Sequence, residues 1–216
     1  MKPLRLLLLL LPLLVGLDAQ AQVQIDYGTF VGFSAARQSP GDDARTGFNL
    51  AGFVEVTPIP YAAAALEVAY VQKGQTFDGP LTQPDDNGDI VVIDQGTFTL
   101  ALDYLSLGLA VKPSLPLGPL GSSVYAVAGP RLDVLLNEKL LFSGDEEDVR
   151  FNIEEHASTV WGYDVGAGLR FGTVLPVPLL VEVRFSGDLT EAYDGLAGRP
   201  DATKNQVMQI RVGVEI

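Results

Sequence analysis

The sequence of 216 residues contains no cysteine and a single histidine, His156. Without cysteine there is no disulfide framework and no thiolate metal site. A single histidine argues against a catalytic triad and against a metal site with several histidine ligands. Basic residues are also scarce, with 14 Lys and Arg against 27 Asp and Glu, and the net charge is −13. Nucleic acid binding requires a basic face, so this composition argues against that function.

Long apolar runs are missing after residue 21, and the run near the N-terminus is short. Lys2 and Arg5 precede a leucine-rich stretch at residues 6–17, and a small-residue cleavage pattern follows at 19–21. This order is typical of a secretory signal peptide. The stretch is shorter than the roughly 17–25 residues of a membrane-spanning helix. We therefore expect residues 1–21 to be a signal peptide that is removed on export.

Apolar residues in the rest of the chain recur with a period of two, as in Val23, Ile25, Tyr27, Thr29 and Val31. This period is typical of a β-strand with one apolar and one polar or small face. The alternation predicts eight strands, within residues 23–34, 48–56, 66–70, 98–111, 124–136, 161–171, 179–185 and 208–216. Residues 98–104 and 105–111 alternate on opposite phases, so we expect a β-bulge near Tyr104.

The connections between these strands are alternately long and short. The long ones are polar and acidic, at 38–47, 78–96, 138–157 and 187–204, and the short ones are proline-rich, at 57–60, 113–122 and 173–178. Outer-membrane barrels have short turns at one end and long loops at the other. The sequence therefore predicts an all-β fold: an eight-stranded, antiparallel, up-and-down transmembrane β-barrel over residues 22–216.

The phase that carries charge is expected to face the barrel interior. An Arg or Lys facing lipid near the bilayer midplane costs about 2–4 kcal/mol. We predict a polar network in the lumen, formed by Asp26, Glu55, Glu67, Arg131, Asp133, Asp164, Arg170, Glu182, Arg184, Arg211 and Glu215. An eight-stranded barrel is just wide enough for side chains to fill it, so we expect no open pore. The predicted aromatic girdle at the lipid interfaces comprises Tyr27, Tyr70, Trp161, Tyr163 and Phe171.

Several segments resemble the PorT-like outer-membrane β-barrel family, and together they extend over essentially the whole chain after residue 21. They are residues 66–74, 104–113, 128–130, 164–169 and 205–210. The resemblance implies an eight-stranded barrel in the outer membrane of a Gram-negative bacterium, and one family member is linked to protein secretion. The chain departs from the usual pattern at its end, where Ile216 stands in place of an aromatic residue.

Two local patterns carry weaker chemical hypotheses. His156 and Ser158 have the His-x-Ser spacing of barrel lipid A deacylases, in which one strand presents a base and a nucleophile. Asp85, Asn87 and Asp89 have the spacing of a calcium loop, but Ile90 occupies the position of the turn glycine. We expect polar, solvated segments at both places, no bound metal and no cofactor.

The sequence thus favours a membrane barrel with a structural, anchoring or loop-mediated binding role and no catalysis. Its expected partners are outer-membrane lipid and lipopolysaccharide and, through the acidic loops, another envelope protein. Divalent cations could bridge the acidic run at 145–148 to lipopolysaccharide. One alternative is a soluble exported barrel of lipocalin type that holds an apolar ligand. Another is an outer-leaflet enzyme that uses His156 and Ser158.

Overall fold

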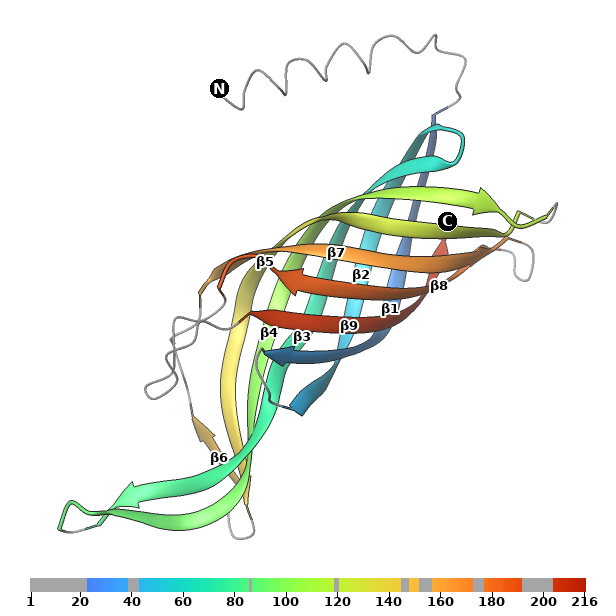
Figure 1. Ribbon diagram of the computed structural model, residues 1–216. Helices are drawn as coiled ribbons and strands as arrows, with labels where there is room; N and C mark the ends of the chain where they lie inside the picture. Colours follow the sequence, from blue (N-terminus) through green and yellow to red (C-terminus); the bar gives the residue numbers. More distant parts are fainter. Residues whose placement is uncertain are drawn as a thin grey trace, which may run out of the picture.

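The computed structural model describes residues 23–38, 43–85, 87–118, 121–144, 148–151, 157–172, 177–191 and 204–216. These residues form one antiparallel sheet (Figure 1). Its strands are β1 (Gln24–Gln38), β2 (Asp43–Ile59), β3 (Ala62–Pro84), β4 (Ile90–Pro116), β5 (Ser123–Gly144), β6 (Asp148–Phe151), β7 (Thr159–Phe171), β8 (Leu179–Asp188) and β9 (Asn205–Glu215). No helix in the described part of the chain has the length and apolarity to cross a membrane.

The sheet closes on itself. The strands lie in the order β4-β3-β2-β1-β9-β8-β7-β5, and β4 also pairs with β5. The first and last strands meet along a register that runs from Gly28 opposite Glu215 to Gln38 opposite Asn205. These pairings make a ring of eight antiparallel strands, which confirms the predicted fold. The short β6 pairs only with Leu140–Ser143 of β5 and lies outside the ring.

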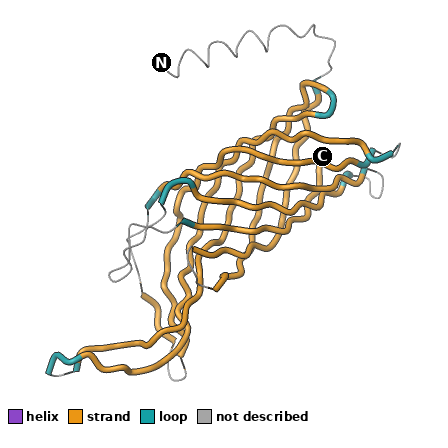
Figure 2. The backbone as a smooth tube through the Cα atoms, viewed as in Figure 1, coloured by secondary structure: helices purple, strands orange, loops and turns teal. Residues whose placement is uncertain are grey.

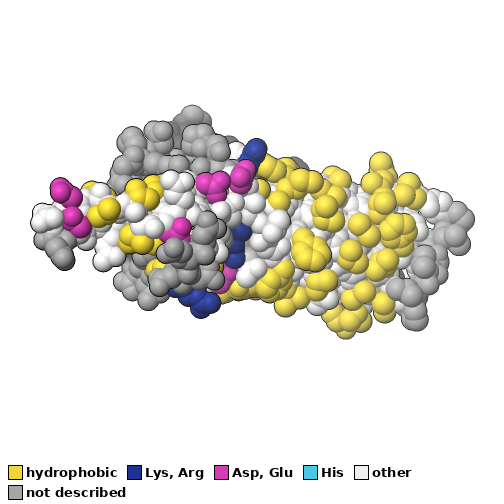
Figure 3. Space-filling view, turned by 90° about the horizontal axis from the view of Figure 1, so that it is seen from below, with side chains coloured by type: hydrophobic (Ala, Val, Ile, Leu, Met, Phe, Trp, Pro, Cys, Tyr) yellow, Lys and Arg dark blue, Asp and Glu magenta, His cyan; other side chains and the backbone are white. Residues whose placement is uncertain are grey.

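The two faces of the ring differ in chemistry, as the alternation predicts. Outward positions are apolar and exposed, among them Val31, Leu109 and Ile210. Inward neighbours such as Glu182 and Arg211 are buried. Figure 3 shows hydrophobic side chains covering the barrel half of the surface, while acidic side chains lie toward the other half. An apolar outer belt around a charged interior is the arrangement that a lipid bilayer favours.

Inward aromatic rings are accommodated by glycines on the neighbouring strand. Tyr125 is paired with Gly168, where a Cβ atom would lie 2.3 Å from the ring of Tyr125. Phe30 lies against Gly213 in the same way, and a Cβ atom on this glycine would lie 2.6 Å from the ring. The missing side chains thus leave the space that these rings fill. Glycine on the inward phase therefore relieves crowding by aromatic rings.

Three strands extend well beyond the barrel. β3, β4 and β5 contain 23, 27 and 22 residues, whereas about 9–11 residues cross a bilayer. Figures 1 and 2 show them continuing past the ring at the end opposite the described N-terminal residues. We call the continuation, residues 74–85, 87–100, 137–144 and 148–151, the strand extension. The prediction that 78–96 and 138–157 are loops was therefore wrong for most of their described residues. Both faces of the extension lie beyond the lipid-facing belt, so these residues pair without the alternation that marks a membrane strand.

The predicted bulge at Tyr104 was assigned to the wrong strand. The register between β4 and β5 does shift at Asp103 and Tyr104, but the residue left over is Leu136 of β5. β4 keeps its own alternation, so Leu100, Leu102 and Tyr104 face inward and are buried, in contact with Val160. Here the apolar phase faces the interior because the strands are leaving the lipid-facing part of the ring.

Gly74 lies where β3 leaves the barrel, and its φ is 127°. A Cβ atom there would lie 1.9 Å from the carbonyl oxygen of Leu100. We expect Gly74→Ala to lower the free energy of unfolding by about 1–3 kcal/mol, since a non-glycine residue is strained in this conformation. Urea titration in lipid vesicles measures the effect. The control is Gly52→Ala, whose Cβ would meet no atom within 4 Å. Equal shifts in the two variants would contradict the interpretation.

Candidate functional site

The barrel interior contains a connected set of ion pairs centred on Arg131. Its Nε lies 2.9 Å from Asp133 Oδ2, its Nη1 3.0 Å from Asp164 Oδ1 and its Nη2 2.7 Å from Asp188 Oδ1. Lys73 Nζ lies 2.5 Å from Asp133 Oδ2 and 3.4 Å from Asp188 Oδ1. All five side chains are buried. The two cations therefore pair with three carboxylates that would otherwise be costly to remove from water.

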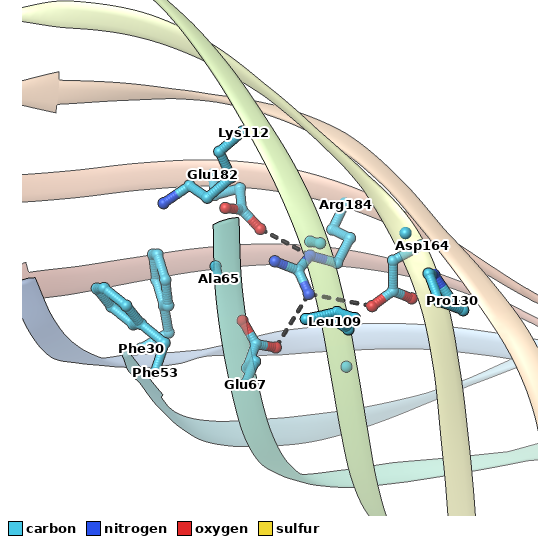
Figure 4. Close-up of a pocket in the computed structure, with 13 residues that line it drawn as sticks. Phe30, Phe53, Ala65, Glu67, Leu109, Lys112, Pro130, Asp164, Glu182 and Arg184 are labelled. Carbon is cyan, nitrogen blue, oxygen red and sulfur yellow. Dashed lines mark hydrogen bonds and ion pairs between the residues drawn. The ribbon is translucent and has the colours of Figure 1, made fainter. Parts of the chain in front are cut away.

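A second group of ion pairs shares the Asp164 carboxylate with the first. Arg184 Nη1 lies 3.1 Å from Asp164 Oδ2 and 3.0 Å from Glu67 Oε1, and its Nε lies 2.8 Å from Glu182 Oε1. Arg211 donates to both oxygens of Glu67 and to Glu182. Figure 4 shows the Arg184 guanidinium between these three carboxylates, which come from β3, β7 and β8. We call the two groups together the central ion-pair network: Glu67, Lys73, Arg131, Asp133, Asp164, Glu182, Arg184, Asp188 and Arg211.

Two further ion pairs lie toward the end with the short connections. Lys112 pairs with Glu55, and its Nζ lies 4.5 Å from the centre of the Tyr125 ring. The Tyr125 hydroxyl donates to Glu182 Oε2 at 3.1 Å, which connects this pair to the central ion-pair network. Arg170 pairs with Glu215 and is the more exposed, with 28% of its side chain accessible.

The structure brings most of the predicted lumen residues together. Glu55, Glu67, Arg131, Asp133, Asp164, Glu182, Arg184, Arg211 and Glu215 all point inward, and each has an ion-pair partner. Arg170 also reaches inward to Glu215. Asp26 lies apart on the inward phase near the start of β1, half-buried, where its carboxylate accepts a hydrogen bond from Gln24.

The predicted girdle residues face outward in two groups along the strands. Tyr27 and Phe171 lie near the ends joined by short connections, and Trp161 and Tyr163 lie near the opposite end of β7. Tyr70 lies midway along β3 and packs on Phe48, with 5.3 Å between ring centres. Tyr27 and Trp161 are well exposed, whereas Phe171 and Tyr70 are half-buried.

Three charged residues of the interior were missed from the sequence. Lys73, Lys112 and Asp188 lie just past the ends of the alternating segments, in residues assigned to connections or left out of the network. The signal was present, because each has the same parity as its inward neighbours. Asp188, for example, is two residues after Ser186 and four after Arg184. Extending each alternating segment by one to three residues would have included them.

The interior leaves little free space. The cavity beside Phe30, Phe53, Glu67, Lys112 and Arg184 has a volume of about 10 Å³, which is at most the space of a single water molecule. Side chains thus fill the lumen around Glu67 and Arg184. A lipocalin-type barrel needs an apolar interior with room for a ligand, so this alternative does not fit the structure.

The strand extension has an inner aromatic row and an acidic tip. Phe77 stacks on Phe98 with 5.2 Å between ring centres, and Phe98 packs at a tilt against Phe142 with 4.8 Å between ring centres. At the tip, Asp85 Oδ1 accepts hydrogen bonds from the backbone N–H groups of Asp89 and Asn87. These bonds lower the pKa of the Asp85 carboxyl. The carboxylate closes the turn between β3 and β4.

The weaker chemical hypotheses gain no support from the described residues. His156 lies outside them, and Ser158 is exposed, with its carbonyl accepting a hydrogen bond from the N–H of Leu135. The Asp85 carboxylate is engaged with its own turn. In the described part of the chain, no group of three or more His, Cys, Asp or Glu side chains is arranged to hold a metal ion.

Solved structures of three proteins are similar to this chain. The chain is similar in fold to Neisserial surface protein A, with 14% identity, 89% of this chain and 96% of that chain covered, and a TM-score of 0.47. It is similar to Ail of Yersinia pestis, solved with the heparin analogue sucrose octasulfate, with 11% identity, 89% and 99% covered, and a TM-score of 0.40. For the N-terminal barrel of Pseudomonas aeruginosa OprF the identity is 13%, 90% and 100% are covered, and the TM-score is 0.36.

No curated protein matches the sequence. The family described as outer membrane protein beta-barrel domain matches residues 19–193, which is most of the chain. The ring of eight antiparallel strands, the apolar outer face and the charged interior agree with this match. The chain therefore belongs to the outer membrane protein beta-barrel family.

Proposed function

We propose that the protein is a closed membrane anchor that holds the strand extension above the outer membrane, where the extension binds other molecules. One observation carries the proposal: β3, β4 and β5 continue in register far beyond the ring, while the central ion-pair network fills the ring itself. A filled interior is suited to anchoring, and an ordered sheet outside the lipid is suited to presenting a surface. Catalysis has no part in this proposal.

The extension is expected to lie on the cell surface, because outer-membrane barrels place short turns in the periplasm and long connections outside. The absence of native cysteine allows single-cysteine labelling without background. We expect Gln83→Cys to react with a membrane-impermeant maleimide in intact cells. Leu117→Cys, in the short connection between β4 and β5, should react only after the outer membrane is permeabilised. The reverse pattern would contradict the proposal.

The filled interior predicts that the protein does not conduct ions. Purified protein inserted into planar lipid bilayers should show no stepwise increase in current, whereas a porin added to the same bilayers provides the positive control. The physical reason is that the buried ion pairs leave only about 10 Å³ of free volume beside Arg184. Regular conductance steps from the unmodified chain would show an open lumen and would contradict the anchor function.

Residues 1–21 serve as the export signal in this proposal, and the mature barrel begins at residue 22. The narrower resemblance to PorT-like barrels stays a prediction. The proposed partners are outer-membrane lipid and lipopolysaccharide around the apolar belt, and an envelope or external protein at the extension.

A further inference from the structure

The far part of the strand extension is a two-stranded ribbon with both outer edges unpaired. β2 pairs with β3 only as far as Thr76, and β5 pairs with β4 only as far as Gly96. In the described part of the chain, no strand pairs with the outer edge of residues 78–84 or of residues 90–93. An unpaired edge presents free N–H and C=O groups to any extended chain that approaches it.

The two edges differ in their suitability for pairing. The outer edge of β3 carries Pro80 and Pro84, which have no N–H and protect an edge against strand addition. The edge of β4 consists of Ile90, Val91, Val92 and Ile93, which are 78, 48, 54 and 50% exposed. These β-branched residues favour strand pairing and include neither proline nor lysine. Only one edge is therefore open to a partner.

A bulge limits the length of this edge. Leu81 pairs with Asp94 and Thr82 with Val92, so Ile93 is the extra residue. Residues 90–92 remain in regular register before it. An added strand would therefore be short, and the side chains around it would supply much of the selectivity.

The charge around this edge selects the kind of partner. Between Lys73 and Lys112 the sequence has six Asp and no Lys, Arg or His. Three of these carboxylates, Asp78, Asp85 and Asp89, belong to the ribbon or its turn. A hollow of about 470 Å³ lies beside Asp78, Pro80 and Gln95, next to the free edge. A second copy of this chain, or an anionic lipid headgroup, would bring like charges to the same place.

We propose that the edge of β4 at residues 90–93 is a docking site for an extended segment of another protein, whose apolar residues are flanked by Lys or Arg. The segment adds to the sheet as a further strand, in the mode known as β-augmentation. Main-chain hydrogen bonds to residues 90–93 hold it, its apolar side chains cover Ile90 and Val92, and its basic flanks lie near the carboxylates. The site rests on the proposed function, since it must face outward to meet such a partner.

The test uses the full chain in detergent micelles and a synthetic probe, a short peptide of alternating valine and threonine with lysines at both ends. Val91→Lys combined with Val92→Lys places two charges on the free edge. Thr82→Lys combined with Gln83→Lys is the matched control, because these residues are their cross-strand partners. We expect the edge variant to weaken peptide binding at least about tenfold and the control variant about threefold or less. Amide hydrogen exchange should slow at residues 90–93 when the peptide binds.

Equal losses in both variants would overturn the proposal, because they would reduce it to general charge attraction. Equal binding of a peptide with glutamate flanks, or of one with proline at its centre, would overturn it as well. Protection of residues 90–93 in a dimer without peptide would show a second copy as the occupant and would also refute it. Peptide binding to the purified chain is independent of cell-surface labelling at Gln83→Cys, so failure of the docking site and failure of the anchor function are distinguishable.

Discussion

Arg131→Ala is expected to lower the free energy of unfolding by about 3–5 kcal/mol, the cost of breaking a buried ion pair by removing one partner. Arg131 contacts Asp133, Asp164 and Asp188, and the substitution leaves these buried carboxylates with Lys73 and Arg184 as their remaining cations. Urea titration in phospholipid vesicles, followed by the fluorescence of the single tryptophan, Trp161, measures the change.

Arg170→Ala is the matched control for this prediction. Arg170 makes one ion pair, with Glu215, and part of its side chain is exposed. Partly exposed pairs contribute about 0–1 kcal/mol, so this variant should unfold close to the unmodified chain. Arg131→Lys keeps the positive charge but lacks the several N–H donors of the guanidinium. Its free energy of unfolding should therefore lie between those of Arg131→Ala and Arg170→Ala. If Arg131→Ala unfolds at the same urea concentration as Arg170→Ala, the central ion-pair network does not stabilise the barrel.

A charge on the outer face should have a comparable effect. Val31 lies midway along β1 and is paired with Leu50 and Val212, and all three side chains are exposed. In water such exposure is harmless, but in a bilayer these residues contact hydrocarbon. Val31→Arg should therefore cost about 2–4 kcal/mol, measured by the same titration in vesicles.

The position along the strand provides the control. Ile25 lies on the same face of β1, near its end, where the cost of an arginine falls to about 0–1 kcal/mol. A large loss for Val31→Arg with a small one for Ile25→Arg would locate the belt at the middle of the strand. Equal small losses for both variants would mean that this face does not contact lipid.

The period-two alternation was sufficient to predict the fold class, because burial of one face per strand is a local property. The alternation placed Arg184 and Glu182 on one face of a strand and Val183 on the other, without information about the neighbouring strands. The alternation of long and short connections then implied an up-and-down order of the strands. The assignment of the apolar phase to the outer face was wrong where β4 leaves the barrel, since Leu100 and Tyr104 are apolar and yet face inward.

Sequence alone therefore determined most of the side chains that face inward and how many strands form the ring. Tertiary structure decided which of them meet. Arg211 contacts Glu67 across 144 residues, and Arg184 contacts Glu67 across 117. The partners on opposite walls depend on the stagger between strands and on the closure of β1 against β9, which alternation does not encode. The strand extension is also a tertiary result, because its residues are held by pairing between strands and carry no lipid-facing pattern.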